Sequence, residues 1–114
     1  MKLKTQTHGN VVVLEVKGKV MGGPDATLFA DTLKAEIGKG FKSFIFDLSG
    51  VDWMNSSGLG ILIAGFTTIK NAGGDLKLAR VTEKIQSLFM ITKLVTIFES
   101  FETVEEAIQA FQQG

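Results

Sequence analysis

The sequence predicts a single α/β domain, with a mixed sheet that is parallel in its centre and has helices packed against it. Two observations support this prediction. Short runs of β-branched and aromatic residues alternate along the chain with segments that carry apolar residues at helical spacing. Such alternation implies a sheet whose parallel strands are joined by helices. The second observation is the length of 114 residues, which suits one domain over residues 1–114.

The first elements lead from an edge strand into the interior. Residues 2–8 alternate in polarity, as in a half-exposed edge strand, and a turn at Gly9-Asn10 leads into a mostly buried strand over 11–17. A loop over 18–24 follows, and its Pro24 suits the first turn of a helix because no N–H is needed there. Residues 24–38 carry apolar side chains on one face and are expected to form that helix.

The middle of the chain is expected to contain a strand, a helix and a further strand. The strand covers 42–48, where aromatic and β-branched residues form an apolar run. The helix covers 56–71, with apolar residues at helical spacing, and the fourth strand covers 75–79. Glycines between these last two elements provide the turn.

The C-terminal part is expected to contain a helix, a short strand and a last helix. Thr82 can cap the first helix, which turns Ile85, Leu88 and Phe89 inward. A short strand is expected near 95–98. Thr103 can cap the last helix, and Glu106 three residues later completes a capping box. The expected order of elements is therefore β-β-α-β-α-β-α-β-α.

The composition argues against several classes of partner and site. Lys+Arg and Asp+Glu both number 12, and this balance argues against nucleic acid, which favours a basic excess. With no cysteine and a single histidine, we expect no metal site, and we expect no cofactor. The first residues lack the apolar core of a signal peptide. No stretch approaches the roughly 18 to 20 apolar residues of a membrane span, so a cytoplasmic protein without membrane insertion is expected.

The segment from Asp47 to Gly60 is the most informative part of the chain. It places Ser56 and Ser57 where a strand has ended and a helix begins. A serine there lies near unpaired backbone N–H groups and the positive end of a helix dipole, which suits a phosphate group. The alternative interpretation is ordinary helix capping by Asn55-Ser56-Ser57-Gly58, with Gly58 relieving crowding in the first turn.

The other polar and glycine residues of this segment do not complete a catalytic set. Gly58 and Gly60 lack the spacing of a nucleotide phosphate loop. Asp47 and Asp52 could bind Mg²⁺ or act as acid and base, but an aspartate at a strand end is commonly a turn residue. Because no catalytic partner stands out beside them, we expect a binding protein and no enzyme.

Apolar residues flank the two serines. Met21 follows the second strand, and Trp53 and Met54 precede Asn55. Loops at the carboxyl ends of parallel strands usually form the binding surface, so these residues are either buried lids or an exposed patch for a protein partner. The residues expected at the partner contact are Met21, Gly22, Gly23, Trp53, Met54 and Leu59.

Two motifs in this segment resemble the STAS domain of the bacterial anti-sigma factor antagonists. They are Asp47-Leu48-Ser49-Gly50-Val51 and Asn55-Ser56-Ser57-Gly58-Leu59-Gly60. The resemblance continues through Gly73-Gly74-Asp75-Leu76 and covers nearly the whole chain. It implies a single STAS domain over residues 1–114, with the element order expected above.

The resemblance implies a phosphoprotein that regulates transcription by partner switching. Ser57, the serine immediately before the glycine, would be phosphorylated by an anti-sigma factor that is also a serine kinase. The unphosphorylated form would bind that partner and free the sigma factor, and a serine phosphatase would reset the switch. The chain departs from the family's pattern at Asn55, where aspartate is usual, and at Met21, where aspartate is frequent.

Two other functions stay open. One is a non-switching STAS scaffold, such as a subunit of a signalling or lipid-transport assembly, in which Ser57 only caps the helix. The other is a small module that binds a nucleotide or lipid at the serine loop. Ser57→Asp separates the first of these from the switch, because a scaffold keeps its partner when a negative charge is introduced at this position.

Overall fold

The computed structural model of the chain describes residues 1–92 and 97–113. Its elements follow in the order expected from the sequence. The strands are β1 (Lys2–His8), β2 (Val11–Val20), β3 (Ser43–Met54), β4 (Asp75–Ala79) and β5 (Glu99–Phe101). The helices are α1 (Pro24–Gly38), α2 (Ser56–Asn71), α3 (Glu83–Ile91) and α4 (Val104–Gln113).

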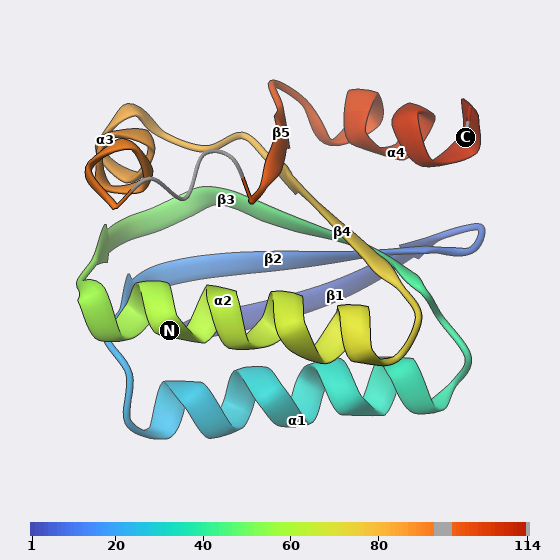
Figure 1. Ribbon diagram of the computed structural model, residues 1–114, viewed down its shortest axis with the longest axis horizontal. Helices are drawn as coiled ribbons and strands as arrows, with labels where there is room; N and C mark the ends of the chain where they lie inside the picture. The colour runs from blue at the N-terminus through green and yellow to red at the C-terminus, as the bar shows by residue number, and fades with distance from the viewer. Residues whose placement is uncertain (93–96, 114) are drawn as a thin grey trace.

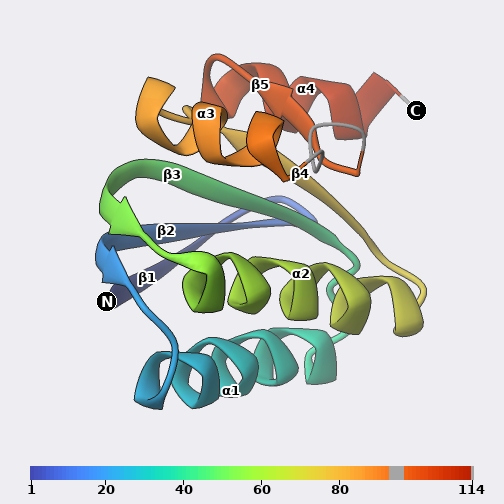
Figure 2. The same cartoon turned by 60° about the vertical axis from the view of Figure 1, so that its left-hand side comes forward.

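The strands form one sheet in the order β1-β2-β3-β4-β5. β1 pairs with β2 in antiparallel fashion, whereas the pairs from β2 to β5 are parallel. α1 and α2 cover one face of the sheet, and α3 and α4 lie over the other (Figures 1 and 2). The predicted mixed sheet with a parallel centre and packed helices is therefore confirmed.

The main core lies between the sheet and the pair α1 and α2. Phe29 of α1 meets Phe46 of β3 edge to face, with ring centroids 5.0 Å apart. Leu62 of α2 is fully buried in the same cluster. A smaller cluster under α4 is formed by Val11, Val13, Ile45, Ala79 and Ala107. Both faces of the central strands are therefore packed, which explains their continuous apolar runs.

The second and third strands are longer than the sequence pattern predicts. β2 continues to Val20 and β3 to Met54, so residues 49–54 are a strand and not the expected loop. This second half of β3 pairs with the end of β2, where Gly18 lies opposite Val51. Register shifts in this part of the pair break the regular alternation of side chains, which is why the pattern did not predict it.

The fifth strand also differs from the prediction, since it covers Glu99–Phe101 and not 95–98. Residues 95 and 96 lie outside the described part of the chain. Phe98 is buried beside the strand, with its ring centroid 5.6 Å from those of Phe66 and Phe89. This apolar residue therefore serves the core as an anchor before the strand begins.

The predicted helices match the structure closely. α1 and α2 have the expected limits, and Pro24 occupies the first turn of α1. The hydroxyl of Thr82 accepts a hydrogen bond from the Ile85 N–H at 3.4 Å. Thr103 likewise accepts one from the Glu106 N–H at 3.1 Å. In α3, Ile85 and Phe89 are buried and Leu88 is half-buried.

Candidate functional site

Asn55 fixes the start of α2 at the edge where β2 and β3 end (Figure 1). Its side-chain oxygen accepts a hydrogen bond from the Gly58 N–H at 2.8 Å, and its backbone carbonyl accepts one from Leu59 at 2.9 Å. The capping interpretation of Asn55 is therefore confirmed. Within the described residues, no hydrogen bond occupies the N–H groups of Ser56 and Ser57. The first turn thus presents two open donors.

Ser57 is exposed and lies against the loop between β2 and α1. Gly22 of that loop lies close to it, since a Cβ added at Gly22 would lie 3.0 Å from the Cβ of Ser57. Gly22 also has a φ of 95°, a conformation that side chains disfavour. A glycine at this position therefore keeps the serine accessible while the two loops stay close together.

Gly58 is required by a close approach to the end of β2. A Cβ at this position would lie 1.8 Å from the carbonyl oxygen of Val20. The Asn55 N–H donates a hydrogen bond to the same carbonyl at 3.4 Å. Gly58 therefore relieves crowding at the first turn of α2, as expected, and the crowding comes from the end of β2. This contact seats the start of α2 on the sheet.

The structure divides the apolar residues expected at a partner contact into two groups. Met21 and Trp53 are exposed, at 48% and 41%. Met54 and Leu59 are 6% and 3% exposed and belong to the main core, so little of either side chain is open to direct contact with a partner. Their burial follows from the extension of β3 to Met54 and from the inward face of α2. They lie beneath the serine edge, which comprises Met21, Gly22, Trp53 and residues 55–58 at the ends of β2 and β3.

The two aspartates of the segment have different environments. Asp47 is 4% exposed, and one of its carboxylate oxygens accepts a hydrogen bond from the Ser49 N–H at 3.0 Å. Its other oxygen lies 3.6 Å from a guanidinium nitrogen of Arg80. Asp52 is exposed on the strand. Asp47 therefore holds the middle of β3 and the end of β4 together, which is a structural role.

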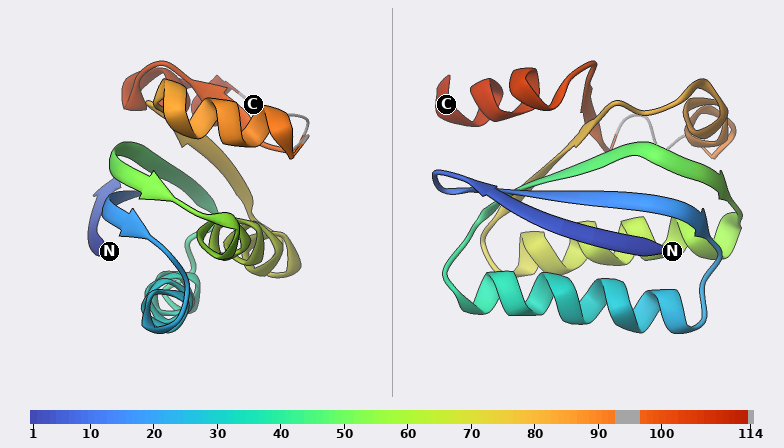
Figure 3. Two further views of the ribbon diagram at one scale, coloured as in Figure 1. Left: turned by 90° about the vertical axis from the view of Figure 1, so that its left-hand side faces the viewer. Right: turned by 180° about the vertical axis from the view of Figure 1, so that it is seen from behind.

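α3 belongs to the same end of the molecule, a feature that the sequence analysis did not single out. Trp53 lines a surface pocket of about 270 Å³ together with Lys84 and Ile91 of α3. Figure 3 shows α3 over the end of β3 that leads into α2. The sequence indicated this pocket only weakly, because Leu88 and Ile91 are just two apolar residues on a short helix.

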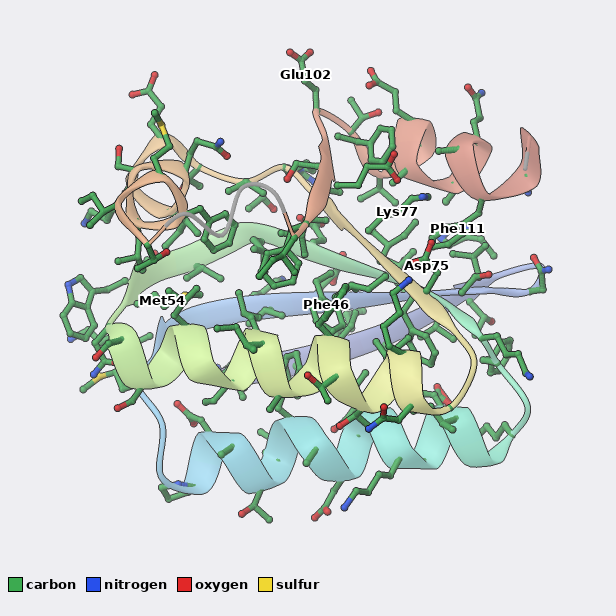
Figure 4. All side chains as sticks on the ribbon, in the orientation of Figure 1. Phe46, Met54, Asp75, Lys77, Glu102 and Phe111 are labelled. Atoms are coloured by element: carbon green, nitrogen blue, oxygen red, sulfur yellow. The ribbon has the colours of Figure 1, made fainter. Side chains whose placement is uncertain are left out.

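A cluster of paired charged side chains lies around β4 and β5 and includes Asp75 and Lys77, which Figure 4 labels. Asp75 accepts hydrogen bonds from Lys70 and from its neighbour's backbone, while Lys77 is 8% exposed and pairs with Glu99. Burial alone would raise the pKa of Asp75, but the hydrogen bonds and the charges of Lys70 and Lys77 together hold that pKa below its ordinary value of 3.8.

The protein is a small α/β domain with a mixed sheet and an exposed serine at the start of α2, where the inner strands β2 and β3 end. No helix in the described parts of the chain has the length and apolarity to cross a membrane. The family model of the STAS domain matches residues 2–107, and the chain therefore belongs to the STAS domain family.

Three similar proteins illustrate the relationship. The anti-sigma-B factor antagonist of Bacillus subtilis is 37% identical over 62 residues, which cover 54% of this chain and 57% of that protein. The crystal structure of TM1081 from Thermotoga maritima has a TM-score of 0.84 at 25% identity, covering 95% of this chain and 92% of that one. The phosphorylated form of the Bacillus cell fate determinant SpoIIAA has a TM-score of 0.74 at 18% identity and shares the fold, covering 96% and 99% of the two chains.

Proposed function

We propose that this protein is an anti-sigma factor antagonist that works by partner switching, controlled by phosphorylation of Ser57. The observation that carries the proposal is the position of Ser57, exposed beside two open N–H groups at the start of α2. The name of the Bacillus subtilis relative supports the class of function. The unphosphorylated protein binds an anti-sigma factor and thereby frees the sigma factor.

The surroundings of Ser57 allow a phosphate without unfolding the domain. A phosphoserine carries about −1.5 to −2 charges at pH 7, and a helix N-terminus stabilises such an anion. Asn55 retains the cap and adds no negative charge beside the phosphate. The modification therefore acts on the surface and leaves the fold intact.

The same phosphate opposes a partner that covers the serine edge. Met21 in the loop before α1 and Trp53 near the end of β3 leave apolar surface exposed, and a close-fitting partner would exclude water from it. Burying an unpaired charge at such a contact costs about 2 to 5 kcal/mol, which lowers affinity by about 30-fold or more. That difference is large enough for a switch.

The partner in this proposal is an anti-sigma factor that is itself a serine kinase, and a serine phosphatase restores the unmodified form. The protein acts in the cytoplasm as a binding module without catalysis of its own. Ser56 supplies an internal control, because it is also exposed and occupies the neighbouring position in the first turn.

The proposal is tested with Ser57→Ala and Ser57→Asp baits in source cells, followed by titration with the purified partner. We expect an anti-sigma factor kinase with the alanine bait and at least 30-fold weaker binding to the aspartate variant. The kinase with ATP should modify the Ser56→Ala variant and leave Ser57→Ala unmodified. Equal retention of one partner by both baits would instead indicate a non-switching scaffold.

A further inference from the structure

The helix α3 packs one face on the main core, and a second face of mixed polarity is open to solvent. Ile85 and Phe89 are buried against the main core. A second set, spaced at i, i+3, i+4 and i+7, lines the surface pocket of about 270 Å³ beside Trp53: Lys84, Ser87, Leu88 and Ile91. Ile91 is 79% exposed. The exposed side chain of Ile91 therefore leaves apolar surface available for a partner.

The α3 groove, defined as the pocket between these four residues and Trp53, continues into the serine edge. Met54 also lines the groove, and its Cγ would lie 3.0 Å from a Cβ added at Gly58. Trp53 and Met54 lead directly into the cap residue Asn55. Figures 1 and 3 both place α3 over the end of β3 where α2 begins. A partner that covers Ser57 is therefore within reach of the groove.

We propose that the α3 groove is a second docking site for the anti-sigma factor kinase, and this inference rests on the proposed function. The α3 groove binds an apolar side chain of the kinase, and an acidic residue of the kinase lies opposite Lys84. The apolar walls formed by Trp53 and Ile91 favour the first group, and the positive charge of Lys84 favours the second. Tryptophan at the centre of such a contact is a frequent source of binding energy.

The groove gives the partner a contact that does not depend on the phosphorylation state. The phosphate on Ser57 weakens the contact at the serine edge, while Trp53, Lys84 and Ile91 keep their chemistry. Truncating Ile91 should therefore weaken binding by a similar factor whether residue 57 is serine or aspartate. Removing this contact should cost about tenfold in affinity, or about 1.4 kcal/mol.

The test uses the purified kinase recovered with the Ser57→Ala bait, titrated against Ile91→Ser and Met90→Ser in the Ser57→Ala background. Met90 is the matched control, because it is 64% exposed in the same last turn of α3 and does not line the groove. We expect about tenfold weaker binding for Ile91→Ser and less than a twofold change for Met90→Ser. Lys84→Glu provides a second variant that keeps the helix and should also weaken binding at least fivefold.

Trp53 offers a direct signal, since it is the single tryptophan of the chain. Its fluorescence should shift to shorter wavelength when the kinase covers the groove, and the shift should persist at saturating kinase with Met90→Ser. If no anti-sigma factor kinase binds the Ser57→Ala protein, the proposed function itself fails. If the kinase binds but Ile91→Ser and Lys84→Glu bind like Met90→Ser, the α3 groove is overturned and the proposed function stands.

Discussion

The serine edge and the charged cluster around β4 use their polar groups in different ways. In the charged cluster, Lys77 lies between Glu99 and the ring of Phe111, with its ammonium nitrogen 4.6 Å from the ring centroid. At the serine edge, the Ser57 hydroxyl and the ring of Trp53 face solvent. The first region satisfies its side chains within the chain, and the second leaves them available to another molecule.

We therefore expect the charged cluster to contribute to the stability of the fold and the serine edge to contribute to binding of the partner. Substitutions in the charged cluster should change the free energy of unfolding and leave partner binding unchanged. Substitutions of exposed groups at the serine edge should do the opposite. Gly58 is the exception at the serine edge, because its backbone contacts β2.

The largest expected effect comes from Gly58→Ala. The new Cβ would lie 1.8 Å from the Val20 carbonyl oxygen, so the start of α2 has to move away from β2. Overpacking of this severity should lower the free energy of unfolding by about 3 kcal/mol or more. Chemical denaturation measures the change. Gly60→Ala is the control, since nothing lies within 4 Å of its added Cβ.

Gly60→Ala should be neutral or stabilise the protein by up to about 1 kcal/mol, because alanine favours a helix interior. Similar stabilities for the two variants would contradict the close contact between Gly58 and β2. Such a result would mean that Gly58, like the exposed residues of the serine edge, does not affect stability.

Lys77→Ala is expected to have the next largest effect. The substitution removes a buried stem and the contact of the ammonium group with Phe111, and it leaves Glu99 without this partner. Stability should fall by about 1 to 3 kcal/mol while affinity for the partner stays unchanged. Lys77→Met retains the stem, so thermal unfolding should show a smaller loss of stability for it than for Lys77→Ala. If Lys77→Ala also lowers the affinity for the partner, the charged cluster is not purely structural and the distinction between the two regions is wrong.

The smallest expected effect is the pH dependence caused by Asp75. Because the native pKa is below 3.8, the ionised form stabilises the fold above that pH, and the contribution disappears as the pH falls through the native pKa. The side chain is 49% exposed, so the contribution should be under about 1 kcal/mol. Unfolding titrations from pH 6 downward should show a shallower loss for Asp75→Asn. Parallel curves would exclude a stabilising role.

The parts of the fold with clean periodicity could be predicted from the sequence. α1, α2 and β4 have the expected limits because their apolar spacing and terminal residues agree. The second half of β3 could not be predicted, since register shifts against β2 break its alternation. Phe98 was misleading in another way, because a short apolar run looks the same whether it forms a strand or places one side chain in the core.

The candidate site could likewise be predicted from the sequence only in part. Asn55 could be identified as a cap because capping depends on neighbours in the sequence. The contact between Gly22 and Ser57 and the pocket between Trp53 and α3 depend on tertiary structure. The burial of Met54 also required the structure, since the pattern placed it in a loop, whereas Leu59 is buried on the apolar face that the helical spacing predicts.

The central claim is that the charge at Ser57 controls binding without changing the fold. Its most direct test is to measure both the affinity for the purified anti-sigma factor kinase and the free energy of unfolding for the wild-type, Ser57→Ala and Ser57→Asp proteins. We expect at least 30-fold weaker binding for Ser57→Asp alone, with stabilities within about 0.5 kcal/mol of one another. Equal affinities for all three, or a loss of binding that follows a loss of stability, would contradict the account.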